Sequence, residues 1–374
     1  GLKSAMLTRL GNEQMGRFLL NELATVGCDI SQVQFDDERL TGLVLLGIKD
    51  RDTFPLLFVR EDVADMNIES SEIREEFIAS AKALTITGTH LSNKKSLAAC
   101  QTAIDYAKKN DTKVCLDIDY RPVLWGLTGK GEGENRYVAD QKVTDHLQAV
   151  LPNFDLIVGT EEEIHIAGGS DDTIECLKTI RKISHAEIVV KRGPSGASCC
   201  SGEIPETLDE GVTVQGVTVE VLNVLGAGDA FMSGFLRGWI RGEGIEMSLR
   251  YANACGALVV SRHGCAPSMP TAEELDYYLR NTDTIPQPDK DDHLNYLHRV
   301  TTRRGEWHDL CVLAFDHRWQ FTEMARDASA DEKDIPYLKR LILKGGFKGA
   351  RRCGLKPDGE SQPGMLCDDI YGQD

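Results

Sequence analysis

Apolar residues recur along this chain in two alternating patterns, short runs of strand-forming residues and longer stretches with helical spacing. The runs with the length and β-branched content of buried strands are 83–88, 113–119, 154–159 and 187–191. The stretches with apolar residues three or four apart are 71–82, 94–109, 140–150 and 171–184. Each helical stretch precedes a strand, and this alternation predicts an α/β fold with a parallel sheet covered by helices on both faces.

The first sixty residues follow a different pattern. A strand at 4–10 and an amphipathic helix through residue 26 precede two apolar strands, 41–48 and 54–60, which a charged turn separates. This arrangement predicts a β-hairpin. Because two strands alone are marginally stable, we expect the hairpin to lean on the domain or on a partner. A lid and a plain edge hairpin remain equally open interpretations.

The polar stretch 281–292 contains two prolines and has the composition of a linker. We therefore expect a domain over 1–280, a linker over 281–308 and the start of a second domain over 309–374. A strand at 310–315 and a helix from about 331 to 344 open that second domain. The chain starts without an initiator methionine, and the second pattern stops after about two elements, so we expect a fragment.

Composition narrows the class of protein. The formal net charge of −17 argues against a nucleic-acid surface, so any anionic ligand must be held by local positive features. No apolar run approaches the length of about 18 residues that a membrane-spanning helix needs. The 11 cysteines are odd in number and contain no CxxC pair, which suits a reducing cytoplasm.

The valine-rich run 212–224 alternates like a strand and leads into Gly226-Ala227-Gly228-Asp229, after which apolar residues recur at helical spacing. A helix start with glycines offers exposed N–H groups and the positive end of the helix dipole, where an anion is stabilised. Asp229 then lies where negative charge would gather, which suits a general base. In isolation, a plain helix-capping aspartate explains it equally well.

Other loops that follow predicted strands support a phosphate-binding cleft. Lys191 to Gly196 form a second glycine turn headed by two cations, and a small-faced helix at 253–260 could flank a nucleotide. Charged or polar residues also follow the strands at 119–121 and 160–163. Ligands of such sheets bind beyond the carboxyl ends of the strands, so these loops should meet there. The chain lacks a P-loop motif.

The segment 226–231 (GAGDAF) resembles the anion-hole motif of the ribokinase-like, phosphofructokinase-B type, sugar kinases, in a context that matches over about 1–280. The segment 119–125 (DYRPVLW) resembles a loop of the keto-deoxy-sugar-acid kinases, and the whole is most similar to the 5-dehydro-2-deoxygluconokinases of inositol catabolism. Some of these are fused to an aldolase-like barrel. The segment 313–318 of this chain resembles the first strand of that barrel. The resemblance implies a doubly wound, mostly parallel sheet with a small hairpin lid, followed by a truncated (β/α) barrel-like segment.

The resemblance also implies site roles. Asp229 would be the general base, and the turn of Gly226, Ala227 and Gly228 would hold the charge that develops on the γ-phosphoryl group. The residues implied on the ATP side are Lys191, Gly193, Gly196, Asn253 and Thr160. Arg121 and Arg60 would bind the sugar acid, although Arg121 is also explained as a brace for its own loop, and Arg60 as a solvated residue at the rim.

Glu163 would organise Mg²⁺ through water, although Thr160 stands where the family has asparagine; a solvated acidic helix start is the alternative. ATP and Mg²⁺ are thus the expected cofactors, with a monovalent cation as an option, and a homodimer through the hairpin is the expected assembly. Neither nucleic acid nor membrane is expected as a partner.

The expected reaction is ATP-dependent phosphorylation of 5-dehydro-2-deoxygluconate to its 6-phosphate. A 2-keto-3-deoxygluconate kinase, or another sugar kinase of the family, is the alternative within the class. An inactive nucleotide-binding fragment is the alternative of another class, because the family's first sugar-binding element, Gly-Gly…Asn, would lie before the strand at residue 4. An aldolase led by the C-terminal segment is a weaker third option, since no Schiff-base lysine can be assigned.

Overall fold

The computed structural model describes residues 2–49, 55–132, 137–302, 309–355 and 361–366. It divides into two compact units, 1–303 and 304–374, which we describe separately. Within the described ranges, no helix combines the length and the hydropathy that crossing a bilayer requires.

A six-stranded sheet forms the centre of the first unit. Its strands are β5 (Ala83–Thr87), β6 (Lys113–Asp117), β7 (Leu156–Thr160), β8 (Glu187–Lys191), β9 (Ala197–Cys200) and β10 (Val212–Val214). They lie in the order β10-β9-β8-β7-β6-β5. Strands β5 to β8 are parallel, and β9 is antiparallel to both of its neighbours, β8 and β10. The predicted α/β fold with a mostly parallel sheet is confirmed.

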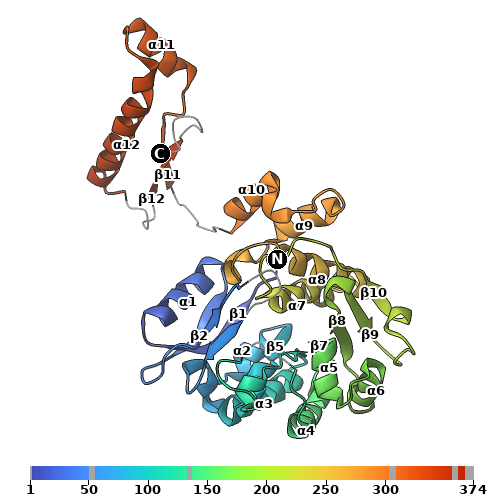
Figure 1. Ribbon diagram of the computed structural model, residues 1–374. Coiled ribbons are helices and arrows are strands. Elements are labelled where there is room, and N and C mark those ends of the chain that lie inside the picture. Colours follow the sequence, from blue (N-terminus) through green and yellow to red (C-terminus); the bar gives the residue numbers. More distant parts are fainter. Residues whose placement is uncertain (1, 50–54, 133–136, 303–308, 356–360, 367–374) are drawn as a thin grey trace. The chain divides into compact units, whose positions relative to one another are not determined.

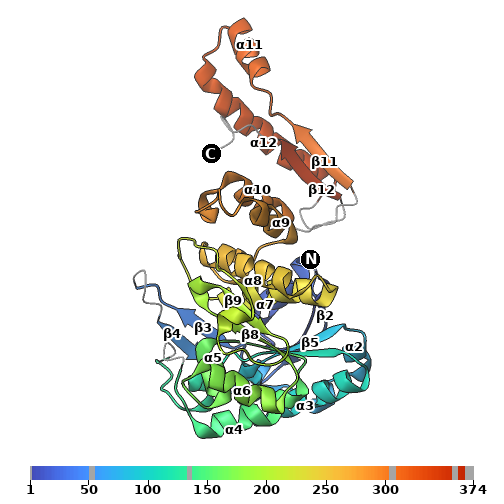
Figure 2. The ribbon, with the colours of Figure 1, turned by 90° about the vertical axis from the view of Figure 1, so that its right-hand side faces the viewer.

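Helices cover both faces of this sheet (Figures 1 and 2). On one face lie α3 (Lys94–Lys109), α4 (Gln141–Val150), α5 (Glu161–Gly168) and α6 (Thr173–Ile183), and on the other lie α7 (Ala227–Arg241) and α8 (Ile245–Val260). Successive strand residues alternate between these layers: Val114 and Leu116 pack in the first, whereas Cys115 packs with Phe235 in the second. Burial on both faces explains why the strands read as continuous apolar runs.

The N-terminal part forms two smaller sheets. β1 (Ala5–Gly11) and β2 (Asp29–Asp36) pair in parallel around α1 (Gln14–Thr25), and β3 (Leu43–Leu46) and β4 (Leu56–Val59) form the predicted antiparallel hairpin. Most of the turn, 50–54, lies outside the described residues. One hairpin face is buried at Leu56 and Phe58. The opposite face is exposed, and its large apolar residues are Leu43, Leu45, Leu57 and Val59.

Two predicted elements are shorter than expected. The helix predicted over 71–82 is limited to α2 (Glu75–Ala79), because a separate turn over 70–72 is closed by its own capping box with Glu69. The strand predicted over 212–224 is wrong beyond Val214. There the amide of Asn253 donates to the carbonyls of Val214 and Gln215, so the chain leaves the sheet.

The segment expected to be a linker contains an ordered helix. α9 (Ala272–Asn281) is followed by α10 (Asp292–Thr301), and the two pack together beyond α8 (Figures 1 and 2). Asp291 caps α10 by accepting from the N–H of Leu294, whose side chain is fully buried in the apolar cluster of α8 and α9. This part of the chain therefore belongs to the first unit.

In the second unit, β11 (Asp309–Ala314) pairs in parallel with β12 (Ser361–Leu366), and α11 (Trp319–Asp327) and α12 (Ile335–Arg352) connect them. The helix expected over 331–344 is α12, which begins four residues later and ends at Arg352. It therefore includes the first residues of the segment 350–363 that we expected to be a loop. One strand–helix–strand unit is compatible with the start of a barrel, which stays a prediction.

Candidate active site

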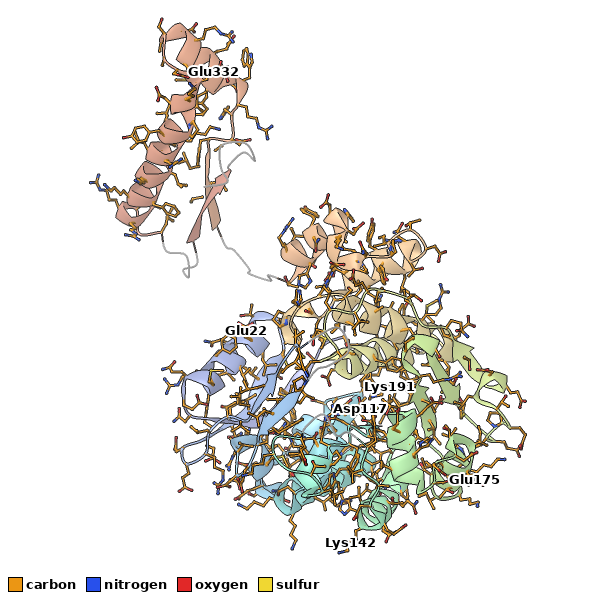
Figure 3. All side chains as sticks on the ribbon, in the orientation of Figure 1. Glu22, Asp117, Lys142, Glu175, Lys191 and Glu332 are labelled. Carbon is orange, nitrogen blue, oxygen red and sulfur yellow. The ribbon has the colours of Figure 1, made fainter. Side chains whose placement is uncertain are left out.

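Charged side chains from three neighbouring strand ends meet on the same side of the central sheet. Lys191, the last residue of β8, has its Nζ 2.9 Å from Oδ1 of Asp117 at the end of β6. The same Nζ is 3.7 Å from Oε2 of Glu163 in the first turn of α5. Figure 3 shows Asp117 and Lys191 side by side inside the first unit. The predicted convergence beyond the carboxyl ends of the strands is therefore present.

This cluster contains more negative than positive charge. Burial is the largest effect on the pKa of Asp117 and raises it, and the nearby carboxylates of Glu163 and Asp119 add to the rise against the opposing Lys191. Burial would lower the pKa of Lys191, but Asp117 and Glu163 outweigh it and raise that pKa. Lys191 therefore stays a cation, and the carboxylates of Asp117 and Glu163 hold its ammonium group in place.

Glu163 is a structural part of this cluster. It forms a capping box with Thr160: the Thr160 N–H donates to Oε2 at 2.8 Å, and the Glu163 N–H donates to the Thr160 hydroxyl at 3.2 Å. The Tyr120 N–H donates to Oε1 at 3.3 Å. The alternative of a solvated acid at this position is wrong, because only 4% of Glu163 is exposed.

The start of α7 is the turn that the sequence predicted to be an anion hole. Gly226 is its N-cap with φ of +87°, a conformation that favours glycine, and it has no side chain to cap the helix. The N–H groups of Gly228 and Asp229 lie in the first turn, where an α-helix supplies no acceptor. A methyl group on Gly228 would lie 3.5 Å from Nζ of Lys191, so a cation stands beside these donors. An anion bound here would contact both.

Asp229 itself remains exposed at the surface of the site. Its pKa is raised, first by partial desolvation and then by the Asp119 carboxylate, whereas Lys191 and Arg121 act in the opposite direction. These groups therefore lie within electrostatic reach of one another. An exposed carboxylate beside an anion hole, with a raised pKa, has the position and the chemistry of a base for a bound hydroxyl.

The two glycines expected on the nucleotide side shape the turn between β8 and β9. Gly193 and Gly196 have φ of +55° and +92°, and a methyl group on Gly196 would lie 2.0 Å from the carbonyl oxygen of Val214. Asn253 lies behind this turn, with its amide nitrogen donating to Val214 and Gln215 at 3.0 Å. It acts on the shape of the turn, because its amide hydrogens are already engaged.

Two arginines lie in the surroundings of Asp119. Arg121 pairs with Asp119 at 2.6 Å, and Asp119, with φ of +31°, also accepts from the Thr89 hydroxyl at 2.7 Å. Arg60 pairs with Asp65. Burial is the main cause that lowers the pKa of Arg60, and Asp119 opposes it. Arg121 thus contacts Asp119 directly, whereas Arg60 contacts Asp65 and feels Asp119 only as a nearby charge.

His90 stands beside this group and was missed by the sequence analysis. Its pKa is lowered to about 4, first by burial and then by the Arg60 cation, so the ring is neutral. Within the described part of the chain, three buried polar atoms here have no hydrogen-bond partner: Nε of Arg60, Oδ1 of Asp65 and Nε2 of His90. Such atoms are costly to bury unless a polar ligand completes them.

Asp117 and Asn223 were missed as well. Asp117 had a usable signal, since it ends a strand two residues before Asp119. Asn223 is almost fully buried. Its side chain accepts from the Leu225 N–H at 2.9 Å and donates to the Gly264 carbonyl, which braces the chain just before Gly226. No local sequence pattern predicts that contact, because Asn223 and Gly264 are 41 residues apart.

Replacing Gly226 with alanine is expected to lower phosphoryl-transfer activity on the order of 10-fold or more, because the anion hole must shift. The added methyl would lie 2.6 Å from Sγ of Cys265 in a left-handed conformation. Gly242→Ala at the other end of α7 is the matched control: its φ is +71° and its methyl meets nothing within 4 Å. We expect it to cost about 1 kcal/mol of stability and no activity. Steady-state rates of the two variants, compared at equal folded fraction, test this; equal activities would contradict it.

The chain is similar to known carbohydrate kinases. Residues 1–272 match the family model described as pfkB family carbohydrate kinase, and residues 274–374 match an uncharacterised family conserved in bacteria, DUF2090. A protein of Bacillus subtilis named 5-dehydro-2-deoxygluconokinase is 33% identical over 286 residues, which cover 75% of this chain and 82% of that protein. A protein of the same name from Halalkalibacterium halodurans is 33% identical over 292 residues, covering 76% and 82%.

Solved structures show the same fold. A PfkB protein from Polaromonas sp. JS666 has a TM-score of 0.60 and 26% identity, covering 74% of this chain and 84% of its own. A putative ribokinase II from E. coli, in complex with ATP and Mg²⁺, has a TM-score of 0.65 and 22% identity, covering 75% and 84%.

Proposed function

The chain belongs to the pfkB family of carbohydrate kinases, and from this premise we propose that it phosphorylates a deoxy-keto sugar acid with ATP. The proposed substrate is 5-dehydro-2-deoxygluconate and the product is its 6-phosphate. The curated relatives with that activity in their names, at 33% identity, support this choice. Arg121 and Arg60, two cations within electrostatic reach of Asp119, also support an acidic substrate.

The observation that carries the substrate class is the group of Arg60, Asp65 and His90 next to Arg121. A guanidinium matches a planar carboxylate with two parallel hydrogen bonds. The unpartnered polar atoms of Arg60, Asp65 and His90 are suited to the hydroxyl and keto groups of a sugar. In this proposal Arg121 pairs with the substrate carboxylate and is released from Asp119.

The proposed mechanism assigns the proton to Asp229. Its carboxylate orients the sugar hydroxyl and accepts the proton as the bond to phosphorus forms, a step in which positioning counts for more than basicity. The N–H groups of Ala227, Gly228 and Asp229 stabilise the charge on the phosphoryl oxygens, and Lys191 stands beside them. Lys191, Thr160 and the turn from Gly193 to Gly196 line the ATP side, with Asn253 bracing that turn.

ATP and Mg²⁺ are the co-substrate and metal of this proposal, as in the E. coli relative's complex. Both oxygens of Glu163 already accept hydrogen bonds, and the described residues contain no group of three or more metal-ligating side chains. Glu163 therefore suits a contact through water, with the phosphates as the direct ligands. Bound Mg²⁺ would neutralise charge on the phosphates. A requirement for a monovalent cation stays a prediction.

Turnover of the purified full chain with three acceptors tests the substrate. We expect kcat/KM for 5-dehydro-2-deoxygluconate to exceed that for 2-keto-3-deoxygluconate, and both to exceed that for fructose, which lacks the carboxylate, by on the order of 100-fold, the value of a lost charged hydrogen bond. Coupled measurement of ADP release gives the three values. Equal turnover of both sugar acids would favour the broader 2-keto-3-deoxygluconate type of kinase, and ATP binding without any turnover would leave a nucleotide-binding module.

Two further parts of the proposal concern assembly and location. The exposed face of the hairpin carries Leu43 opposite Val59 and Leu45 opposite Leu57, an apolar strip suited to pairing with a second copy. A cytoplasmic location is supported by the cysteines, because all ten that the structure describes are free thiols.

A further inference from the structure

The loop 262–269, between α8 and α9, supports the anion hole from behind. Its Cys265 lies against Gly226, since a methyl group on Gly226 would be 2.6 Å from Sγ and 3.6 Å from Cα of Cys265. The loop is also joined to the preceding turn, because Asn223 donates to the Gly264 carbonyl. A shift of this loop therefore moves Gly226, and with it the first N–H groups of α7.

His298 on α10 holds the other side of this loop. Its Nε2 is 2.9 Å from the carbonyl oxygen of Pro267. A carbonyl only accepts hydrogen bonds, so Nε2 carries a hydrogen and donates it. Arg262 contributes a second, longer bond at 3.3 Å to the Ser268 carbonyl. The helix that we expected to lie in a linker thus contacts the loop that backs the anion hole.

A buried carboxylate fixes the ring of His298. Glu274 is fully buried and accepts from Arg262 NH2 at 2.6 Å, and Nδ1 of His298 lies 3.0 Å from its Oε2. The same Nδ1 is 3.4 Å from NH1 of Arg262. A charged ring donates to Glu274, and a neutral ring accepts from Arg262. In both states Nε2 keeps its hydrogen, so the contact with Pro267 does not depend on the charge of the ring.

The loop 262–269 borders a pocket on the side of α10. Pro267, Ser268 and His298 line a cavity of about 390 Å³, together with Leu222, Arg262, His263, Asp289 and Asn295. Pro267 itself is exposed. Ser268 is buried and Met269 packs against the core, whereas Pro267 faces this pocket, so the hydrogen bond from His298 acts at the exposed tip of the loop.

We propose that His298 is a positioning residue for phosphoryl transfer, which holds the loop 262–269 against Gly226 through the hydrogen bond from Nε2 to the Pro267 carbonyl. This rests on the proposed kinase function of the anion hole. It makes α10, the last helix before the second unit in the chain, a part of the catalytic support of the first.

Two substitutions separate the two contacts of the ring. In His298→Gln the amide nitrogen takes the place of Nε2, so the bond to Pro267 is kept and the contact with Glu274 is lost. In His298→Asn the amide nitrogen takes the place of Nδ1, so the contact with Glu274 is kept and the bond to Pro267 is lost. Both variants lose one contact of the same residue, and each serves as the control for the other.

For the full-length chain we expect His298→Asn to lower kcat on the order of 10-fold, with KM for the sugar acid unchanged, because a misplaced anion hole affects the transition state. His298→Gln should keep kcat within about 2-fold, since a neutral hydrogen bond to the loop is preserved. The proposal is overturned if both variants have the kcat of the unmodified chain, or if both lose the same factor in kcat. A residue that only docks α10 would not distinguish the loss of the Nε2 contact from the loss of the Nδ1 contact.

Cys265 provides a readout that needs no turnover. Its thiol is half-buried against Gly226, so its rate of alkylation by iodoacetamide, followed by peptide mass spectrometry, reports the position of the loop. We expect this rate to rise about 5-fold in His298→Asn, as expected for one lost hydrogen bond, and to be unchanged in His298→Gln. Equal alkylation rates in the two variants overturn the positioning role. If the unmodified chain phosphorylates no sugar acid, the proposed function fails, and the alkylation rates still decide this inference.

Discussion

Asp229→Asn is expected to lower kcat by a factor on the order of 10² to 10⁴, the range typical of a lost acid–base group. Asparagine keeps the volume of aspartate but cannot accept the proton of the sugar hydroxyl. Because the N–H groups of the anion hole remain in place, binding of ATP should be nearly unchanged. Steady-state kinetics and a titration with a fluorescent ATP analogue measure the two quantities separately.

The matched control is Glu246→Gln, which neutralises another exposed acid in the first turn of a neighbouring helix, α8. It should leave both kcat and ATP binding unchanged. If Asp229→Asn keeps more than about a tenth of the activity, a base role worth at least 10²-fold is excluded. Asp229 would then contribute only the favourable charge of an acid in the first turn of α7, since the helix cap itself is Gly226.

The rate profile with pH adds a check on Asp229. A base must be ionised to accept a proton, so activity is lost as the pH falls through the pKa of Asp229. Partial desolvation and Asp119 raise that pKa above its ordinary value of 3.8. The acid limb of kcat/KM should therefore lie above pH 3.8 and be absent from the residual activity of Asp229→Asn.

Lys191→Met is expected to destabilise the first unit by about 3–5 kcal/mol, the cost of leaving a buried charge without its partner. The substitution removes the cation between Asp117 and Glu163, whose side chains are 7% and 5% exposed. It should also abolish activity, since Lys191 stands beside Gly228 in the anion hole. Urea unfolding followed by circular dichroism measures the loss of stability.

Lys113→Met tests whether burial of the ion pair causes the large loss of stability expected for Lys191→Met. Lys113 pairs with Asp155 at 2.9 Å, the same distance as the pair of Lys191 and Asp117, but its side chain is 59% exposed. A surface pair contributes about 0.2–1 kcal/mol. Similar losses of stability in the two variants would show that burial of the Lys191 cluster does not determine its contribution.

The elements of the core were predictable because their signals are local. α3 coincides with the stretch 94–109 that its apolar spacing predicted, and β8 coincides with its apolar run. The tight turn at Gly226 was predictable for the same reason. Glycine at 226 is required by a backbone conformation that the tight turn imposes, and the acid follows three residues later.

The errors came from contacts between distant segments. The strand predicted beyond Val214 ends because Asn253, 39 residues away, engages its carbonyl group. The segment read as a linker folds because Leu294 finds a place in the cluster of α8 and α9. Prolines and polar residues suggested a loop there, but tertiary burial outweighed that local preference.

Strand–helix alternation was enough to identify the fold class, and the resemblance carried by the Gly-Ala-Gly-Asp motif indicated a sugar kinase, in agreement with the match to the pfkB family. They could not identify the partner of Lys191, which is 74 residues away in the chain, nor the burial of Glu163 or the contact of His298 with the loop behind Gly226. The reason is physical. A turn or a helix start is specified by neighbouring residues, whereas the charge state and the orientation of a side chain depend on groups that only folding brings within a few ångströms.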